Sequence, residues 1–549
     1  MNDQRPTTNN QQPPIWRDLL WITAVSLLIQ AFWAARLTHP SYFDAYYYTT
    51  NGQRLADGYG FTEEIIWQYL DDPAGLPTPS LTYWMPLPAI IAAVGYSVSD
   101  SFRAAQFPFW LMAGLLPLMS YFISWRLSGG QRWQARTAAL FTAAGGYYAA
   151  YWNQPSTFAL YAWTGGGCLL ALALAQTLER DNGRKRAWFA AGLLAGLSHL
   201  ARADGILLLA VGGWVWLLGL RRGAGVRRPK VAWCRGEKSP LHPITLSPLL
   251  LFLAGYLLIM FGWFWRTWQV TGRPLSTVGT ETIFLTNYDD LFAYGRHANP
   301  ADYFAWGWGN IIQSKLEALW LAAQTFIGVT GLTIFTFFFV WAWIKLGRDE
   351  KMRRFLRPFT WYTPIVFGAM SLIFTFPGQR GSLLHTSTAL WPWSMALAAA
   401  GIGFAVDWMA ARLPHWQPEK SKPLFASMFI VVVFAISLAV SGGQPLRDEN
   451  AAIYAEINAV LPPDAIVMSG DAPGFYYHTD HPAIIVPNEP PQILPEIAAR
   501  YGATYLILDE DRPKPLADFY EGKVSLPQIR PIQRFGKHTI LYRFEGVAR

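Results

Sequence analysis

Long apolar segments separated by short polar ones constrain this chain more than any other feature of its sequence. We expect eleven of them to cross a membrane, near residues 16–37, 102–125, 137–152, 157–178, 187–201, 204–220, 246–268, 316–345, 358–376, 383–405 and 424–440. A helix pairs its own backbone groups, so about 20 apolar residues in helical form can span a bilayer. The sequence therefore predicts a polytopic α-helical membrane protein.

The distribution of charge supports this prediction and orients the chain. Charged residues make up 15% of the 549 residues, against roughly 25% in soluble domains. The net charge of +8 comes mainly from short basic runs between apolar segments, which are typical of topology signals and not of a nucleic-acid surface. With the N-terminus inside, the inner segments hold 25 Lys and Arg residues and the outer ones hold nine. The positive-inside rule predicts a multi-pass protein of the cytoplasmic membrane with a cytoplasmic N-terminus.

The chain divides into a tail, a membrane domain and a second domain. Residues 1–15 are polar, and we expect a disordered cytoplasmic tail. Residues 16–440 form the membrane domain, whose first extracytoplasmic loop covers 38–101. Within that loop, 81–98 is apolar but interrupted by two prolines, which favours a re-entrant or interfacial helix. Residues 441–549 are expected to form a small extracytoplasmic α/β domain. Its strands are expected near 465–469, 483–487, 504–508 and 538–543, and its helices near 449–460 and 491–501.

The first loop combines carboxylates with aromatic rings. Asp44 follows the first apolar segment directly, and a carboxylate at the mouth of a helical bundle needs water or a partner, which makes it a candidate functional residue. Tyr46, Tyr47, Glu63 and Trp84 lie in the same loop. Rings that cover apolar sugar faces, together with carboxylates that bind hydroxyls, suit a sugar ligand. The alternative is an aromatic belt at the membrane interface with solvated acids.

Two arginines stand at the outer ends of predicted spans, against the positive-inside trend. Arg202 ends the fifth span, where it could bind a lipid phosphate or pair with Asp204. Arg380 begins the tenth span, with His385 about one turn further in. These residues could form an anion site that faces the bundle. The alternative for Arg380 is a side chain that snorkels to the interface.

Other motifs carry less weight. The sequence contains no Walker A motif, no HExxH and no nucleophile elbow, which weakens ATP-driven transport and metalloprotease or serine-hydrolase chemistry. Asp471, His478, Asp480 and His481 cluster in the tail, but their spacing matches no metal site. No metal-binding residue is therefore predicted.

Taken together, these residues resemble the GT-C superfamily of polytopic membrane glycosyltransferases, in the branch related to protein O-mannosyltransferases and the aminoarabinose transferases of lipid A. The resemblance is specific in four stretches, at residues 43–61, 84–88, 200–205 and 380–387. It implies a polyprenyl-phosphate-linked sugar donor, an extracytoplasmic acceptor and Asp44 as the general base or the group that orients the acceptor. Many relatives have Asp-Glu where this chain has Asp44-Ala45, and an acid in the second loop where it has Asn153-Gln154. Both departures weaken a divalent-metal mechanism, although a divalent metal stays open as a cofactor.

The resulting hypothesis is an inverting hexosyl- or pentosyltransferase that acts on a glycan, lipid or protein acceptor at the face of the bilayer where loop one lies. Arg380, Arg202 and His385 would bind the donor phosphate, and Tyr46, Tyr47, Trp84 and Glu63 would bind the sugar or the acceptor. One alternative is a transporter, flippase or binding protein for a polyprenyl-linked glycan. Against it stand the lack of an inverted repeat and of ionisable residues deep in most spans. A scaffold that binds through its tail is a third reading.

Overall fold

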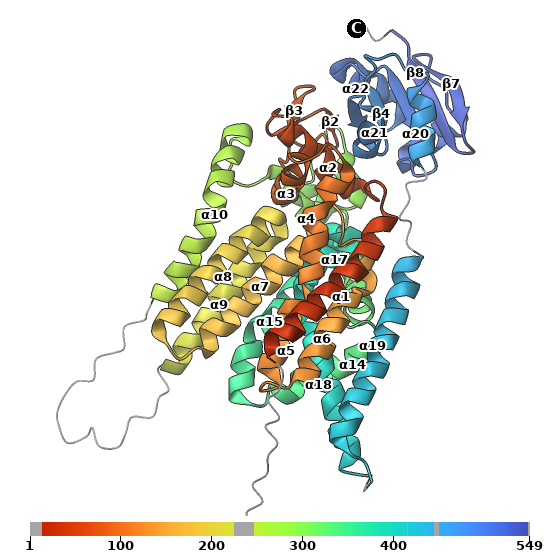
Figure 1. The fold of residues 1–549 in the computed structure, drawn as a ribbon. Helices are drawn as coiled ribbons and strands as arrows, with labels where there is room; N and C mark the ends of the chain where they lie inside the picture. Colours follow the sequence, from red (N-terminus) through yellow and green to blue (C-terminus); the bar gives the residue numbers. More distant parts are fainter. Residues whose placement is uncertain (1–13, 224–245, 414, 444–449, 547–549) are drawn as a thin grey trace, which may run out of the picture.

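The computed structural model of the chain describes residues 14–223, 246–413, 415–443 and 450–546. A bundle of long helices carries the first loop and a sheet-containing domain at one end (Figure 1). We call this the loop end, and we call residues 38–101 loop one. The disordered tail expected over residues 1–15 lies almost wholly outside the described residues, as does most of the basic stretch 221–238.

Seven helical segments of the described chain are long and apolar enough to cross a membrane. They are α1 (Ile15–Arg36), α4 with α5 (Phe102–Leu115 and Pro117–Leu127), α7 (Thr157–Thr177), α9 (Leu207–Gly223) with the turn before it, α10 (Ser247–Thr271), the run from α16 to α18 (Thr375–Ala410) and α19 (Pro418–Gly442). One bent helix pair raises the count to eight. This is fewer than the eleven expected from the sequence.

The remaining expected spans correspond to helices that are shorter or more polar. They are α6 (Arg132–Ala144), α8 (Asp181–Ala201) and α15 (Glu350–Gly368). Arg136 of α6 pairs with the buried Asp18 of α1 at 2.6 Å, so two charges are placed side by side inside the bundle. Burying a charge is tolerable only when it is paired in this way.

The expected span over residues 316–345 is broken in the structure. Helix α13 (Trp308–Gln324) continues through a π-helical stretch, and α14 (Ile334–Leu346) leaves it at an angle of 93°. Leu332 and Thr333 lie at the break with positive φ angles of 46° and 54°. The segment is apolar throughout, so its hydropathy gave no sign of the bend.

Loop one begins with α2 (Phe43–Ala56), which is supported by the short helix α3 (Leu87–Tyr96). Ten residues at about 1.5 Å each cannot cross a bilayer, which agrees with the interfacial or re-entrant helix expected there. The two helices approach closely at Gly52, where an added Cβ atom would lie 2.7 Å from the Cβ of Ala92, about one helical turn after Ala89 in α3. Because glycine has no Cβ atom, α3 can pack closely against α2 at this position.

The sheet of the C-terminal domain contains a strand from loop one. Its strands, in spatial order, are β2 (Ile65–Ile66), β5 (Ala483–Ile485), β4 (Val467–Ser469), β6 (Tyr505–Leu508), β8 (Thr539–Phe544) and β7 (Ile529–Phe535). The first four run parallel, and β8 and β7 are antiparallel to their neighbours. The strands and helices expected in the tail are confirmed, but the sheet extends beyond the tail because β2 belongs to loop one.

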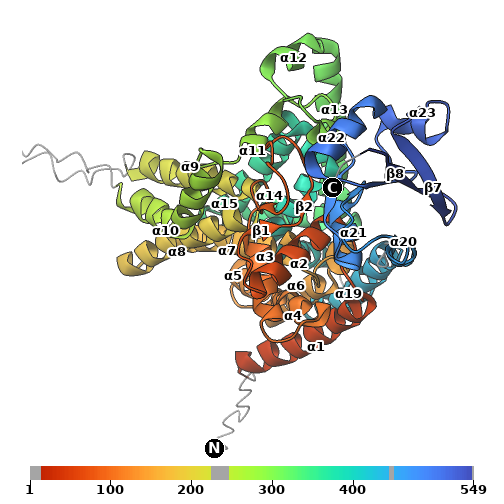
Figure 2. The same ribbon diagram turned by 90° about the horizontal axis from the view of Figure 1, so that it is seen from above.

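Helices pack on this sheet, and smaller elements complete the loop end. The tail helices are α20 (Asn450–Asn458), α21 (Ala472–Thr479), α22 (Leu494–Tyr501) and α23 (Ala517–Tyr520). The smaller elements are the strand pair β1 (Thr62–Glu63) and β3 (Thr78–Pro79), with helices α11 (Thr277–Glu281) and α12 (Pro300–Ala305). Seen from above, the C-terminal domain sits to one side of the bundle, away from α8, α9 and α10 (Figure 2).

Candidate active site at the loop end

Asp44 lies in the first turn of α2, at the boundary between loop one and the bundle. A carboxylate at a helix N-terminus is favoured by the unpaired backbone N–H groups and by the helix dipole. The chain just before it is fixed, because the Gln154 side chain accepts a hydrogen bond from the Ser41 backbone N–H at 3.0 Å. The Asp44 side chain keeps 23% of its surface exposed, so it can be reached by a ligand.

His385 faces Asp44 from the bundle. It lies in α17 (Leu383–Ser387), and its Nε2 atom is 3.9 Å from Oδ2 of Asp44. Its other ring nitrogen, Nδ1, lies 2.6 Å from Oγ1 of Thr157, and its ring stacks on Phe158 with centroids 3.8 Å apart. These contacts hold the imidazole with Nε2 directed at the carboxylate. The separation of 3.9 Å is too long for a direct hydrogen bond.

Arg202 approaches the site from the junction between α8 and the turn η2 (Ala203–Ile206). Its Nε donates to Asp204 at 2.6 Å, and one Nη donates to the Ser382 hydroxyl. The Asp204 pair considered in the sequence analysis is therefore present. A guanidinium has five N–H donors, so these two bonds leave three for a ligand.

Arg380 lies in the short helix η8 (Gly378–Ser382) with its side chain exposed. Its guanidinium carbon is 5.3 Å from the ring centre of Tyr288 in η5 (Tyr288–Phe292). No hydrogen bond or ion pair joins Arg380 to another side chain among the described residues. It is therefore a cation positioned over an aromatic ring and available to an anion.

Electrostatic interactions link these groups through Tyr288. Burial raises the pKa of Asp44 to about 6, and the charge of Arg202 opposes that rise. Burial, together with the charge of Asp44, raises the pKa of Tyr288 to about 12, while Arg380 and Arg202 oppose it. The Tyr288 phenol thus senses the Asp44 carboxylate and both guanidinium groups, and Asp44 senses Arg202. Tyr288 was not among the residues singled out from the sequence.

A pocket of about 230 Å³ opens beside Arg202. Its wall combines aromatic rings with aliphatic side chains and hydroxyl groups; it includes Tyr48, Tyr83, Trp84, Arg202, Trp263 and Ser382. Asp44 does not itself line this pocket, but Tyr48 lies one turn further along the same helix. Rings and hydroxyls in this mixture suit a polar ligand with apolar faces.

Three of the residues expected to bind the sugar or the acceptor, namely Tyr46, Tyr47 and Glu63, do not line this pocket. Tyr46 lies on another face of α2 from Asp44, and its hydroxyl is 3.0 Å from Nε2 of His478 in the C-terminal domain. The Tyr47 ring packs 4.5 Å from Trp84, and its hydroxyl accepts from the Leu81 backbone N–H. These tyrosines join α2 to the tail and to the rest of loop one. Of the aromatic residues predicted for the ligand, Trp84 alone lines the pocket.

Glu63 is buried beneath loop one. It accepts a hydrogen bond from Asn51 at 3.2 Å and is also bonded to the Tyr47 hydroxyl. Burial raises the pKa of this carboxyl group to about 8, although both hydrogen bonds lower it. Glu63 is thus placed to hold α2 in position, and a ligand would have no direct access to it.

The second loop also acts as a support. Asn153 donates to the Gln30 side chain of α1 at 3.0 Å, and its carbonyl accepts from Gln106 of α4 at 2.7 Å. Both Asn153 and Gln154 are fully buried. In the described part of the chain, no three His, Cys, Asp or Glu side chains gather in a group that could hold a metal ion. In the tail, Asp471 caps α21, where its side chain accepts a hydrogen bond from the Gly474 backbone N–H.

Comparison with known proteins identifies the fold. No family model and no curated protein matches this sequence. The structure is similar to the oligosaccharyltransferase AglB of Archaeoglobus fulgidus, with a TM-score of 0.57 and 11% identity over 89% of this chain and 69% of that one. It is also similar to ArnT of Cupriavidus metallidurans bound to undecaprenyl phosphate, with a TM-score of 0.56 and 15% identity over 97% and 99%. Both are GT-C glycosyltransferases. The chain has the GT-C fold, as the resemblance of its motifs indicated.

Proposed function

We propose that this protein transfers a sugar, with inversion, from a polyprenyl-phosphate-linked donor to an acceptor at the loop end. The observation that carries the proposal is the meeting of Asp44, His385, Arg202 and Arg380 at one end of a GT-C bundle. These four were singled out from separate parts of the sequence. Two solved proteins of this fold were studied with dolichol phosphate or undecaprenyl phosphate, which supports a lipid-linked donor.

The proposed orientation places the loop end outside the cytoplasm. The basic segments 126–136, 180–186 and 345–357 connect helices at the opposite end, which the positive-inside rule assigns to the cytoplasm. Loop one and the C-terminal domain would then be extracytoplasmic, in a multi-pass protein of the cell membrane. The domain boundary near residue 441 is part of this proposal.

The reaction needs a group that accepts a proton and groups that stabilise the leaving phosphate. The acceptor hydroxyl oxygen would bond to the anomeric carbon of the sugar while the bond from that carbon to the phosphate oxygen breaks. The phosphate keeps the bonding electrons and departs as polyprenyl phosphate. The hydroxyl proton would pass to Asp44, whose pKa of about 6 leaves it ionised at neutral pH.

The two arginines would stabilise the charge that builds on the phosphate. Arg380 is supported for this role because it has no carboxylate partner among the described residues and lies over the ring of Tyr288. Arg202 would contribute its remaining donors from the other side of the site. Preorganised positive groups of this kind usually supply a large share of catalysis in transfer reactions. The aromatic pocket around Trp84 would hold the sugar.

The test is sugar transfer by the purified full chain in lipid vesicles. Radiolabelled polyprenyl-phosphate sugars, hexoses and pentoses, would be offered with cell-envelope extract as the source of acceptor. We expect one donor to support transfer and Arg380→Ala to reduce it by roughly 100-fold or more. Arg273→Ala is the matched control, because Arg273 is an exposed arginine in a loop at the same end. Binding of labelled lipid without transfer from any donor would instead support a carrier or binding protein.

A further inference from the structure

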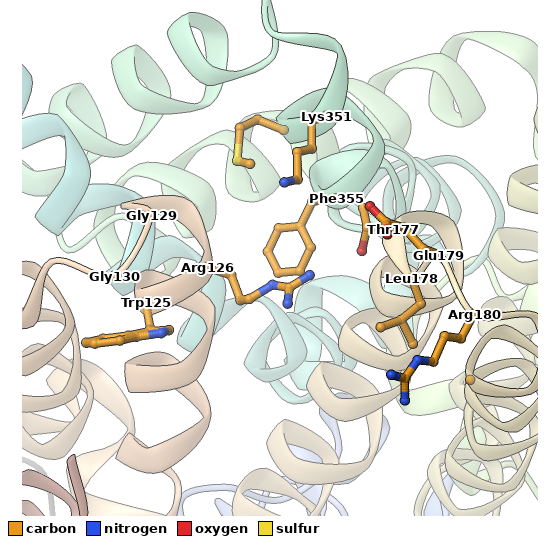
Figure 3. Close-up of a pocket in the computed structure, with 12 residues that line it drawn as sticks. Trp125, Arg126, Gly129, Gly130, Thr177, Leu178, Glu179, Arg180, Lys351 and Phe355 are labelled. Atoms are coloured by element: carbon orange, nitrogen blue, oxygen red, sulfur yellow. The ribbon is translucent and has the colours of Figure 1, made fainter. Parts of the chain in front are cut away.

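A hollow of about 670 Å³ lies at the end of the bundle opposite Asp44. It is formed where α5 ends, where α7 turns into α8 and where α15 begins (Figure 3). Helices α5 and α7 belong to segments long and apolar enough to cross a membrane, so we expect the hollow at their ends to lie near the bilayer interface. Nothing in the proposed transfer reaction uses it.

The hollow is positively charged. Arg126, Arg180 and Lys351 line it together with one carboxylate, Glu179. None of the three cations makes an ion pair with a side chain in the described ranges. In Figure 3 the ring of Phe355 lies between the Lys351 ammonium group and the Arg126 guanidinium group. The surplus of two positive charges therefore faces a shared space.

Neighbouring basic residues at the same end are ion-paired, with two of them sharing each carboxylate. Arg184 and Lys185 pair with Asp181 at 3.0 and 2.7 Å. Arg353 and Arg354 pair with Glu350 at 2.8 and 2.9 Å. The basic side chains just outside the hollow thus form ion pairs, whereas among the described residues the three cations that line it form none.

The wall of the hollow is partly apolar. Arg126 lies over the ring of Phe355, with its guanidinium carbon 5.9 Å from the ring centre, and Trp125 and Leu178 also line the hollow. An anion that also carries apolar groups matches cations set beside such a wall. Arginine is suited to phosphate because its planar N–H groups can donate in pairs.

We infer that this hollow binds the phosphate group of an acidic phospholipid, with Arg126, Arg180 and Lys351 contacting the head group and the Phe355 side accommodating the start of the acyl region. The site is separate from that of the sugar donor, so the inference does not depend on the proposed transferase activity. The lipid would join the ends of α5, α7 and α15, which have no carboxylate bridge between them at this point among the described residues.

The test measures lipid binding to the full chain in detergent by native mass spectrometry. Phosphatidylglycerol, phosphatidylcholine and inorganic pyrophosphate are titrated separately. The double variant Arg126→Gln, Lys351→Gln removes two charges from the hollow. The double variant Arg353→Gln, Arg354→Gln removes two charges from the same end but outside it, and serves as the matched control.

We expect phosphatidylglycerol to bind more tightly than phosphatidylcholine, and the hollow variant to weaken it by roughly tenfold or more while the control changes it by less than about twofold. Equal weakening of phosphatidylglycerol binding in both double variants would show that the effect comes from general surface charge. That result would overturn the inference. Binding of pyrophosphate, together with equal affinity for the two phospholipids, would assign the hollow to a soluble phosphate compound. That result would overturn the lipid assignment. Arg180→Gln alone repeats the test if the double variant fails to fold.

Discussion

The Asp44 carboxylate and the His385 imidazole face each other with 3.9 Å between Oδ2 and Nε2. Asp44 belongs to loop one, and His385 belongs to the helical run that begins at Thr375. The pair therefore spans the junction between the loop and the bundle. A hydroxyl group or a water molecule placed beside both could pass its proton to the carboxylate while the imidazole orients it.

The rate of transfer should depend on the ionisation of Asp44. Its carboxylate is the form that accepts a proton, and the pKa of about 6 places that form in the majority above pH 6. We expect the rate to fall about tenfold per pH unit below this value and to level off above it. A pH–rate profile of the reconstituted protein checks this. A rate that stays constant from pH 7 to pH 5 would exclude Asp44 as the base.

Ionisation of Asp44, which favours transfer, should lower the free energy of unfolding. Because the pKa of Asp44 is higher in the folded protein than its ordinary value of 3.8, the charged form disfavours folding, and this penalty grows as pH rises from about 4 to 6. Asp44→Asn should therefore raise the free energy of unfolding by about 1–3 kcal/mol at pH 8. The gain should vanish near pH 4. Thermal unfolding in detergent at the two pH values measures it, and a destabilised variant at pH 8 would contradict the account.

Thr157 should matter through His385. Thr157→Val removes the hydroxyl 2.6 Å from Nδ1 and leaves the imidazole free to turn. We expect kcat to fall between about 10- and 100-fold, with little change in KM for the donor. Thr157→Ser keeps the hydroxyl and should retain most activity. If valine and serine behave alike, the hydroxyl does not position the histidine.

The C-terminal domain should not fold well without loop one. A fragment of residues 450–549 lacks strand β2, which pairs in parallel with β5, and lacks the Tyr69 hydroxyl, which donates to the Ile485 carbonyl. It would expose the sheet edge and the apolar side chains that loop one covers. We expect a broad thermal transition by circular dichroism. Linking residues 57–82 to the fragment should sharpen that transition, and a sharp transition for the fragment alone would show that the domain is independent.

The candidate site residues that the sequence indicates are the chemically conspicuous ones. Asp44 stands out because it comes shortly after an apolar segment, and Arg202, Arg380 and His385 stand out because basic residues are fewer at the outer ends of the expected spans. The structure places all four at the loop end. Tyr288 and Thr157 gave no such signal, since a tyrosine in a polar loop and a threonine at a helix start are ordinary. Their positions depend on how distant segments pack.

Other features depend on tertiary structure even more strongly. Strand β2 has only two residues, so no alternation pattern could reveal it, and its partner is more than 400 positions away in the sequence. Aromatic and acidic side chains in the same loop predict ligand binding for Tyr46 and Glu63. In the structure, the Tyr46 hydroxyl instead lies beside His478, and Glu63 is buried against Asn51. Which face of α2 each side chain occupies is fixed by the packing of that helix.

The most direct test of the central claim is single-turnover sugar transfer by Asp44→Asn, compared with Asp57→Asn. Asp57 caps the other end of α2 and is exposed, so its substitution removes the same charge from the same helix. We predict that Asp44→Asn still binds the labelled donor but transfers it at least about 100-fold more slowly, while Asp57→Asn transfers at the rate of the unmodified protein. Full transfer by Asp44→Asn would show that the reaction uses another base and would contradict the mechanism proposed for this site.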